Sequence, residues 1–251
     1  MDSDGIQHER TPRPAPAEPI AVRSKAAETS IPELTSPLSE DLVLALLDRR
    51  ELSSETLERL SQDAAGLKSQ KVSVALAAHP RVPRHLALRL ICRFPTFALM
   101  RFALLPAVAA DLKRAADNQL VARLASVTLG ERLTLARRGS QAVSAELLLD
   151  KECRVAQTAL ENARLTEAAV IQAIMRPNIR PVLVETICHH PKWSIRREIR
   201  IALLCSPHTP LARALEFARN LPPPMLRDIL QTSRLPEKIK IYLRHDLLKK
   251  K

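Results

Sequence analysis

Short apolar stretches alternate with polar turns along most of this chain, and their apolar positions recur at the spacing of an α-helix. Helices are predicted from Ser39, where Ser39-Glu40-Asp41 supplies a cap and two acids, and from Ser53. The later predicted ranges are 69–79, 83–93, 95–104, 107–116, 118–127, 129–138, 141–149, 152–162, 166–176, 180–189, 193–204, 210–220, 223–232 and 236–248.

A five-residue phrase recurs at the turns between these stretches. It combines a small polar residue or His, then Pro, Ala or Ser, then a basic residue or His, then a mostly apolar residue, and finally Pro, Ser or Thr. The last position supplies a side-chain cap or a first-turn proline to the next helix. The copies are 79–83, 162–166, 190–194, 206–210 and 232–236, with 105–109 as a weaker one.

The spacing of the phrase predicts a repeat of about 24–28 residues built from two short helices, with 206–210 as a candidate mid-unit turn. A helix pair of this size cannot bury its apolar face alone and must stack on its neighbours. The fold class predicted from the sequence is therefore all-α, a right-handed α-solenoid of short antiparallel helix pairs.

The run 188–211 resembles bacterial helical-repeat proteins of the HEAT-like and leucine-rich-repeat-variant kind, whose repeats carry an Asn-Pro-x-Thr-Pro turn. The resemblance extends over about residues 70–245 and implies repeats rather than an activity. Two departures are visible. The Asn of that turn is replaced here by His79, His190 or Ser206, and no cysteine precedes Cys92, so the iron–sulfur cluster of some variant-repeat proteins has no counterpart.

Composition divides the chain into three parts. Residues 1–37 are rich in proline without an apolar period, which predicts a disordered tail. Residues 38–66, ending at Gly66, are predicted to form an acidic N-terminal cap on the helical-repeat domain 38–251. Residues 67–251 are predicted to form a basic array, since residues 66–251 hold 32 Lys and Arg against 14 Asp and Glu.

Several function classes are disfavoured. The chain has only four glycines, too few for a glycine-rich phosphate loop of the Rossmann or Walker type. Its four cysteines are widely spread, which disfavours a disulfide-rich small domain. We expect no signal segment, because no basic-then-apolar stretch opens the chain. The longest apolar run, near 102–110, has about half the length of a membrane-spanning helix. A cytoplasmic protein without a membrane span is predicted.

The basic charge favours an anionic partner, although Arg and Lys also solvate the outer faces of helices. Arg196 and Arg200 share a helix face, and further basic residues recur in later helices. Trp193 is close to these basic residues in the sequence, but it occupies the apolar position of the phrase, which favours packing in the core over stacking on a base. The candidate binding surface comprises Arg180, Lys192, Trp193, Arg196, Arg197, Arg200, Arg213, Arg227, Arg234 and Lys238.

Two other sets of residues have structural interpretations. Cys188, His189, His190, Cys205 and His208 are the densest set of zinc-type ligands, but they lack the tight paired spacing of a zinc site, so no metal or cofactor is predicted. The apolar stretch 94–102 is interpreted as core rather than as an exposed docking groove.

The sequence therefore predicts a non-enzymatic scaffold that binds an acidic protein partner through a basic solenoid surface. The alternative is nucleic-acid binding along the same basic residues. More remotely, a helical-repeat DNA glycosylase-like enzyme shares the architecture, but its carboxylate and aromatic groove cannot be assigned here.

Overall fold

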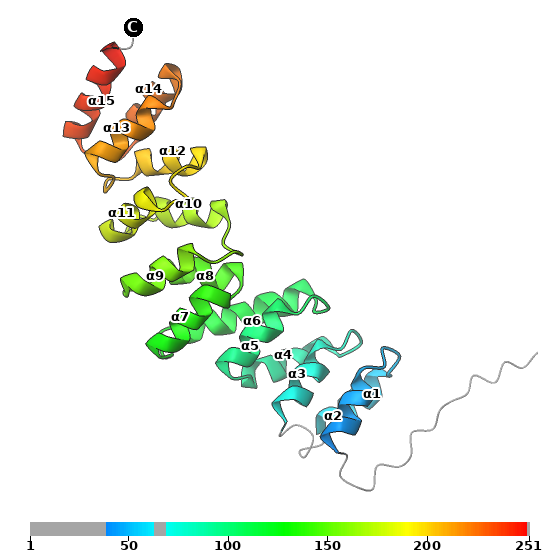
Figure 1. Cartoon of the computed structure of the whole chain (residues 1–251). Coiled ribbons are helices and arrows are strands. Elements are labelled where there is room, and N and C mark those ends of the chain that lie inside the picture. Colours follow the sequence, from blue (N-terminus) through cyan, green and yellow to red (C-terminus); the bar gives the residue numbers. More distant parts are fainter. Residues whose placement is uncertain (1–38, 63–68, 250–251) are drawn as a thin grey trace, which may run out of the picture. The chain divides into compact units, whose positions relative to one another are not determined.

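The computed structural model describes residues 39–62 and 69–249, with side chains described to residue 247 (Figure 1). These residues form fifteen helices and contain no strand, which confirms the all-α class for this part of the chain. The predicted tail and the helix stop at Gly66 lie outside them. The helices are α1 (Glu40–Leu47), α2 (Ser54–Gln62), α3 (Gln70–Ala78), α4 (Arg84–Arg93), α5 (Thr96–Leu104), α6 (Ala110–Arg123), α7 (Leu129–Arg138), α8 (Gln141–Leu147), α9 (Cys153–Leu160), α10 (Glu167–Met175), α11 (Pro181–His189), α12 (Arg197–Cys205), α13 (Leu211–Arg219), α14 (Pro223–Thr232) and α15 (Glu237–Lys249).

The first turns of the helices are fixed by residues that the sequence marks as caps. Ser39 Oγ accepts the N–H of Leu42 at 3.4 Å, and Ser53 Oγ accepts the N–H of Thr56 at 3.2 Å. Pro181 occupies the first position of α11, where a missing N–H costs no intrahelical hydrogen bond. Local capping chemistry thus explains the starts of α1, α2 and α11, close to the predicted positions, whereas α12 begins at Arg197 rather than near residue 193.

One predicted break between helices is wrong. A single helix, α6, spans most of the ranges 107–116 and 118–127, for which two helices were predicted. Its buried residues Leu112, Ala116 and Leu120 recur every four positions and continue one apolar face through the predicted break. No proline or glycine interrupts the backbone there, so the helix continues.

The core is aliphatic, with few aromatic side chains. Phe94 and Phe102 are buried, and their rings meet edge to face with centroids 5.7 Å apart. This confirms the core interpretation of both residues, whereas Phe97 in the same stretch remains 39% exposed.

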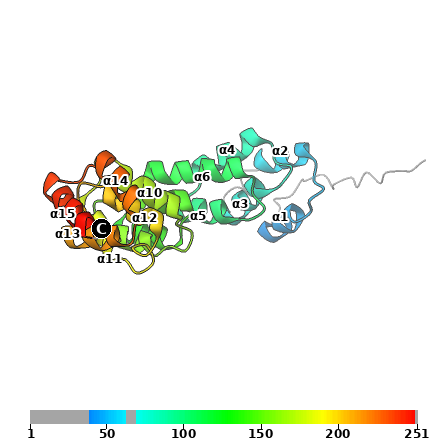
Figure 2. The same ribbon diagram turned by 90° about the horizontal axis from the view of Figure 1, so that it is seen from above.

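Most helices pack against the helix two positions further along the chain. Among even-numbered helices, α4 packs on α6, α6 on α8, α8 on α10, α10 on α12 and α12 on α14. Among odd-numbered helices, α1 packs on α3, α3 on α5, α7 on α9, α9 on α11 and α13 on α15. Consecutive helices such as α3 and α4 or α12 and α13 also pack together. Figure 2 shows the helices of both sets from above.

The first residue of the recurring phrase joins its own turn to an earlier one. Asn162 is buried between α9 and α10, and its Nδ2 donates to the carbonyl oxygens of Ala136 at 2.7 Å and Gly139 at 3.3 Å. Its Oδ1 accepts the N–H of Arg164 at 2.8 Å. One amide group therefore shapes its own turn and holds the C-terminal end of α7.

His79, between α3 and α4, likewise joins its own turn to an earlier one. Its Nε2 donates to the carbonyl oxygen of Arg49 at 3.1 Å, and its Nδ1 accepts the N–H of Arg81 at 3.2 Å. The guanidinium of Arg81 donates to the carbonyl oxygen of Glu51 at 3.1 Å. The bonds to Arg49 and Glu51 span 30 residues. His79 and Asn162 can fill the same position of the phrase because each side chain can both donate and accept a hydrogen bond.

The structure also contains a copy of the phrase that the sequence analysis missed. Residues 176–180 form the turn between α10 and α11, with Ile179 buried at the apolar position and Pro181 following at the helix start. The N–H of Ile179 bonds the carbonyl oxygen of Arg176, as that of Leu165 bonds Asn162. The copy was missed because three of its residues depart from the pattern: Arg176 is neither small and polar nor His, Asn178 is not basic, and Arg180 is not Pro, Ser or Thr.

Replacing Asn162 by Ala should lower the free energy of unfolding by about 1–3 kcal/mol, because two carbonyls and one N–H lose their partner in a buried site. Urea denaturation of the full chain measures this change. Gln172→Ala, an exposed substitution on α10, is the control and should stay within about 0.5 kcal/mol of wild type. Equal losses in the two variants would contradict the role given to Asn162.

Candidate functional site

Nine of the ten predicted binding residues are at least partly exposed, and one is not. Trp193 is 2% exposed, and its indole Nε1 donates to the carbonyl oxygen of Leu160 at 2.8 Å. It lies in the turn before α12, which therefore begins at Arg197 and not near residue 193 as predicted. Trp193 thus packs in the core, and its ring offers no platform to a ligand.

The basic residues around α12 are engaged in contacts within the chain. Lys192 Nζ lies 4.2 Å from the ring centroid of Trp193, and Arg196 pairs with Glu167 at 3.8 Å. Arg200 Nε donates to the carbonyl oxygen of Ser194 at 2.7 Å. These contacts brace the start of α12.

The guanidinium of Arg197 lies at the edge of the same cluster, where its Nη2 is 3.6 Å from Met225 Sδ. It makes no charged contact among the described residues, and Arg196 is exposed beside it. Arg197 is therefore the residue of the α12 cluster that is most available to a partner, whereas the exposed Arg196 is paired with Glu167.

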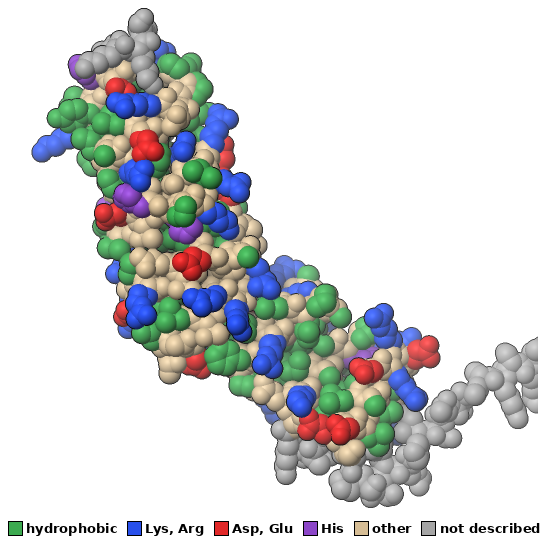
Figure 3. Space-filling model, viewed as in Figure 1, with side chains coloured by type: hydrophobic (Ala, Val, Ile, Leu, Met, Phe, Trp, Pro, Cys, Tyr) green, Lys and Arg blue, Asp and Glu red, His purple; other side chains and the backbone are tan. Residues whose placement is uncertain are grey.

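The remaining candidates are spread over other elements. Arg213 pairs with Glu216 on α13 at 2.6 Å. Arg227 on α14, Arg234 in the following turn and Lys238 on α15 are exposed, and their side chains have no charged partner among the described residues. On the face shown in Figure 3, Lys and Arg side chains are scattered among apolar and acidic ones.

The structure does not bring Arg180 and Lys192 together. Arg180 bonds carbonyl oxygens at the turn before α9, whereas the indole beneath Lys192 bonds Leu160 at the end of α9. α9 has eight residues, and a helix of that length separates the two ends by about 12 Å. A single continuous stripe through all ten candidates therefore does not follow from their positions.

A basic groove that the sequence analysis did not identify lies between α7 and α9. It has a volume of about 600 Å³, and Arg137 and Arg138 of α7 and Arg154 of α9 line it. All three arginines are exposed, and no carboxylate forms an ion pair with any of them among the described residues. Glu161 is the acidic residue in the lining.

The signal for this groove in the sequence is weak. Arg137 and Arg138 end one predicted helix and Arg154 lies near the start of another, separated by a third. Only the packing of each helix on the second one along brings these residues together.

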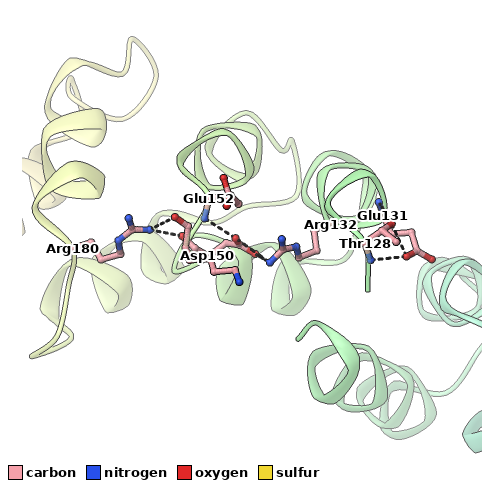
Figure 4. A network of polar contacts seen from close by, with 7 residues as sticks. Thr128, Glu131, Arg132, Asp150, Glu152 and Arg180 are labelled. Atoms are coloured by element: carbon pink, nitrogen blue, oxygen red, sulfur yellow. Dashed lines mark hydrogen bonds and ion pairs between the residues drawn. The ribbon is translucent and has the colours of Figure 1, made fainter. Parts of the chain in front are cut away.

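A polar network beside the groove joins three helices (Figure 4). Arg132 Nη1 of α7 lies 3.4 Å from Asp150 Oδ1 and 3.2 Å from Oδ2. The N–H of Glu152 donates to Asp150 Oδ1 at 2.9 Å. Arg180, at the start of α11, donates to the carbonyl oxygens of Asp150 at 2.9 Å and Lys151 at 2.6 Å.

Because the side chains of Arg132 and Asp150 are only 14% and 6% exposed, this ion pair is shielded from water. Its attraction is therefore screened less than that of the surface pairs. At the other end of the drawing, Thr128 and Glu131 close the start of α7 as a reciprocal capping box, and hydrogen bonds from Thr128 lower the pKa of Glu131.

The predicted zinc-type ligands do not form a metal centre in the described part of the chain. No group of three His, Cys, Asp or Glu side chains there is arranged to hold an ion. Burial raises the pKa of Cys188 to about 12 and also raises the pKa of Cys205, so both thiols are protonated at neutral pH. A protonated thiol is a poor nucleophile.

Within residues 39–62 and 69–249, no helix has both the length and the apolar character that crossing a membrane requires. No protein-family model matches the chain, and no curated protein or solved structure is significantly similar to it. The candidate site therefore depends on the geometry of this chain alone.

Asp150→Ala should lower the free energy of unfolding by about 3–5 kcal/mol, because it leaves the shielded guanidinium of Arg132 without its counter-ion. The double variant Arg132→Met/Asp150→Ala removes both charges and should recover part of that loss. Chemical denaturation of the wild type, both single variants and the double variant measures the coupling between the two residues. A double variant as unstable as the sum of the single losses would argue against the pair.

Stability should fall in acid because of His190. Burial lowers the pKa of this imidazole below the usual 6.5, outweighing the opposing effect of Glu161, while Lys192 lowers it further. Its Nδ1 also accepts the N–H of Lys192 at 3.2 Å, which requires that nitrogen to be unprotonated. A lowered pKa means that the contribution is present above pH 6.5 and is lost as the pH falls through the folded value.

Asn at position 190 keeps an acceptor that does not titrate, as Asn162 does in its own turn. The stability advantage of wild type over His190→Asn should therefore shrink between about pH 7.5 and about pH 5. Urea denaturation across that range measures it, and a constant difference would contradict the assignment.

Proposed function

We propose that this chain is a right-handed α-solenoid of HEAT-like helix pairs that acts as a non-enzymatic scaffold for an acidic protein partner. The packing of helices on the second helix along, and the side chains that join turns about 30 residues apart, support the solenoid. In this proposal α1 and α2 are the acidic N-terminal cap, and the basic array follows from α3.

The observation that carries the proposal is the set of exposed basic side chains without a charged partner. These groups are exposed and make no ion pair among the described residues, and they are spread over several helices. Cations of this kind attract and orient an acidic surface. They include Arg137, Arg138, Arg154, Arg197, Arg227, Arg234 and Lys238.

Nucleic acid is the second candidate, since the chain carries a net charge of +12. Proteins that bind single strands add aromatic stacking platforms to the basic groove. Trp193 is buried, and Tyr242, at 57% exposure, is an aromatic side chain that remains accessible for stacking. The aromatic chemistry thus favours the protein partner over a single strand.

The double charge reversal Arg197→Glu/Arg227→Glu, at two exposed arginines without a charged partner among the described residues, should reduce recovery of an acidic partner in affinity purification by about tenfold or more, because it places like charges at the interface. The matched control Arg50→Glu/Arg93→Glu makes the same change of net charge at exposed Arg50, in the turn between α1 and α2, and at exposed Arg93, at the end of α4. Nuclease treatment before capture should not change the recovered protein.

Fluorescence anisotropy of labelled duplex and single-stranded DNA and of RNA, over a range of salt, completes the test. Tight, steeply salt-dependent binding at physiological salt, together with loss of captured proteins after nuclease treatment, would overturn the protein-partner proposal in favour of nucleic acid.

A further inference from the structure

We propose that the groove between α7 and α9 binds an acidic peptide segment, whose carboxylates are held by Arg137, Arg138 and Arg154. This inference names the partner chemistry of one site on the proposed scaffold. The groove volume of about 600 Å³ lies within the range of about 300–1,000 Å³ that is typical of ligand sites. A groove of this size accommodates several side chains rather than a single ion.

The charge of the groove is unbalanced. Three guanidinium groups face one carboxylate, that of Glu161, and none of the three is neutralised by an ion pair among the described residues. Other arginines nearby are engaged: Arg132 pairs with Asp150, and Arg176 pairs with Glu146 at 2.8 Å. Arginine in this state offers a planar fork of N–H donors that matches a carboxylate.

The two walls of the groove are fixed to each other. Asn162, just after α9, donates to the carbonyl oxygens of Ala136 and Gly139 at the end of α7. Arg164 Nη1 donates to the carbonyl oxygen of Arg138 at 3.4 Å, so the backbone that carries this arginine is held from the opposite wall. A preformed site loses less conformational entropy on binding than one that must be assembled.

Gly139 permits this close junction. A Cβ atom at that position would collide with the carbonyl oxygen of Leu135, which the N–H of Gly139 bonds at 2.7 Å. The turn after α7 therefore needs glycine, and the clamp from Asn162 reaches its backbone directly.

The uncharged lining favours a peptide over a nucleic acid. Gln157 lies in the groove, exposed and without a partner among the described residues, and its amide can both donate to and accept from a peptide backbone. No aromatic side chain lines the groove to stack a base. Glu161 repels a continuous run of phosphates but can accept a peptide N–H.

The test is fluorescence anisotropy of the full chain with a short, fluorescein-labelled polyglutamate peptide at low and at physiological salt. The triple variant Arg137→Ala/Arg138→Ala/Arg154→Ala should weaken binding by about tenfold or more, because it removes all three carboxylate partners. Gln157→Ala should weaken binding about two- to fivefold through loss of one neutral hydrogen bond. Circular dichroism should show unchanged helix content, since all four side chains are exposed.

The matched control is Arg50→Ala/Arg89→Ala/Arg93→Ala, which removes the same charge from exposed arginines outside the groove. It should bind the peptide within about twofold of wild type, apart from a weak long-range effect that salt screens. If both triple variants lose the same affinity, binding reflects net charge alone and the proposed site is overturned.

A second arm uses single-stranded and duplex DNA as probes. If the groove variant loses DNA binding while polyglutamate binding remains equal to wild type, the groove serves nucleic acid and the inference is overturned. Polyglutamate binding that depends on the groove supports the site even if affinity purification recovers no acidic protein. Failure of the affinity purification to recover an acidic protein would contradict only the proposed scaffold function.

Discussion

A helix leaves about four carbonyl groups at its C-terminal end without a partner inside the helix. In helices of nine residues, such as α10, α11 and α12, four carbonyl groups are nearly half of the total. A large share of the backbone polar atoms therefore needs hydrogen-bond partners from outside the helix. Side chains from a turn about 30 residues further on supply the missing donors. Asn162 and Trp193 each reach back in this way to the end of an earlier helix, and His79 reaches back to the turn after α1.

Arginine side chains at the end of α6 and the start of α11 also donate to backbone carbonyl groups about 30 residues earlier in the chain. Arg123 donates to the carbonyl oxygens of Phe94 at 2.6 Å and Cys92 at 2.7 Å, and Arg180 donates to those of Asp150 and Lys151. Part of the basic composition is therefore structural, because a guanidinium carries several donors on a long stem and can bond two carbonyls at once. The positive charge of the chain consequently overstates the surface available to an anionic partner.

The sequence predicted the helices well because their signals are local. Caps such as Ser39 and first-turn prolines such as Pro181 act on neighbouring backbone groups, so a linear pattern contains them. The predicted break near residue 117 failed because a polar stretch on the outer face of α6 resembles a turn when its inner face is not considered. Trp193 packs in the core, as its position in the phrase indicated, so its inclusion among the candidate binding residues was wrong.

The candidate site was less predictable for a physical reason. Arg180 and Arg154 look alike in the sequence, yet Arg180 bonds two carbonyls of an earlier turn, whereas Arg154 faces an open groove. The difference arises from which backbone atoms lie within reach after the helices stack, and no local pattern encodes it. Function in such a chain is therefore best sought among the arginines that the stacking leaves unoccupied. By that criterion, the groove between α7 and α9 is a better candidate site than the α12 cluster, whose side chains mostly contact their own turn.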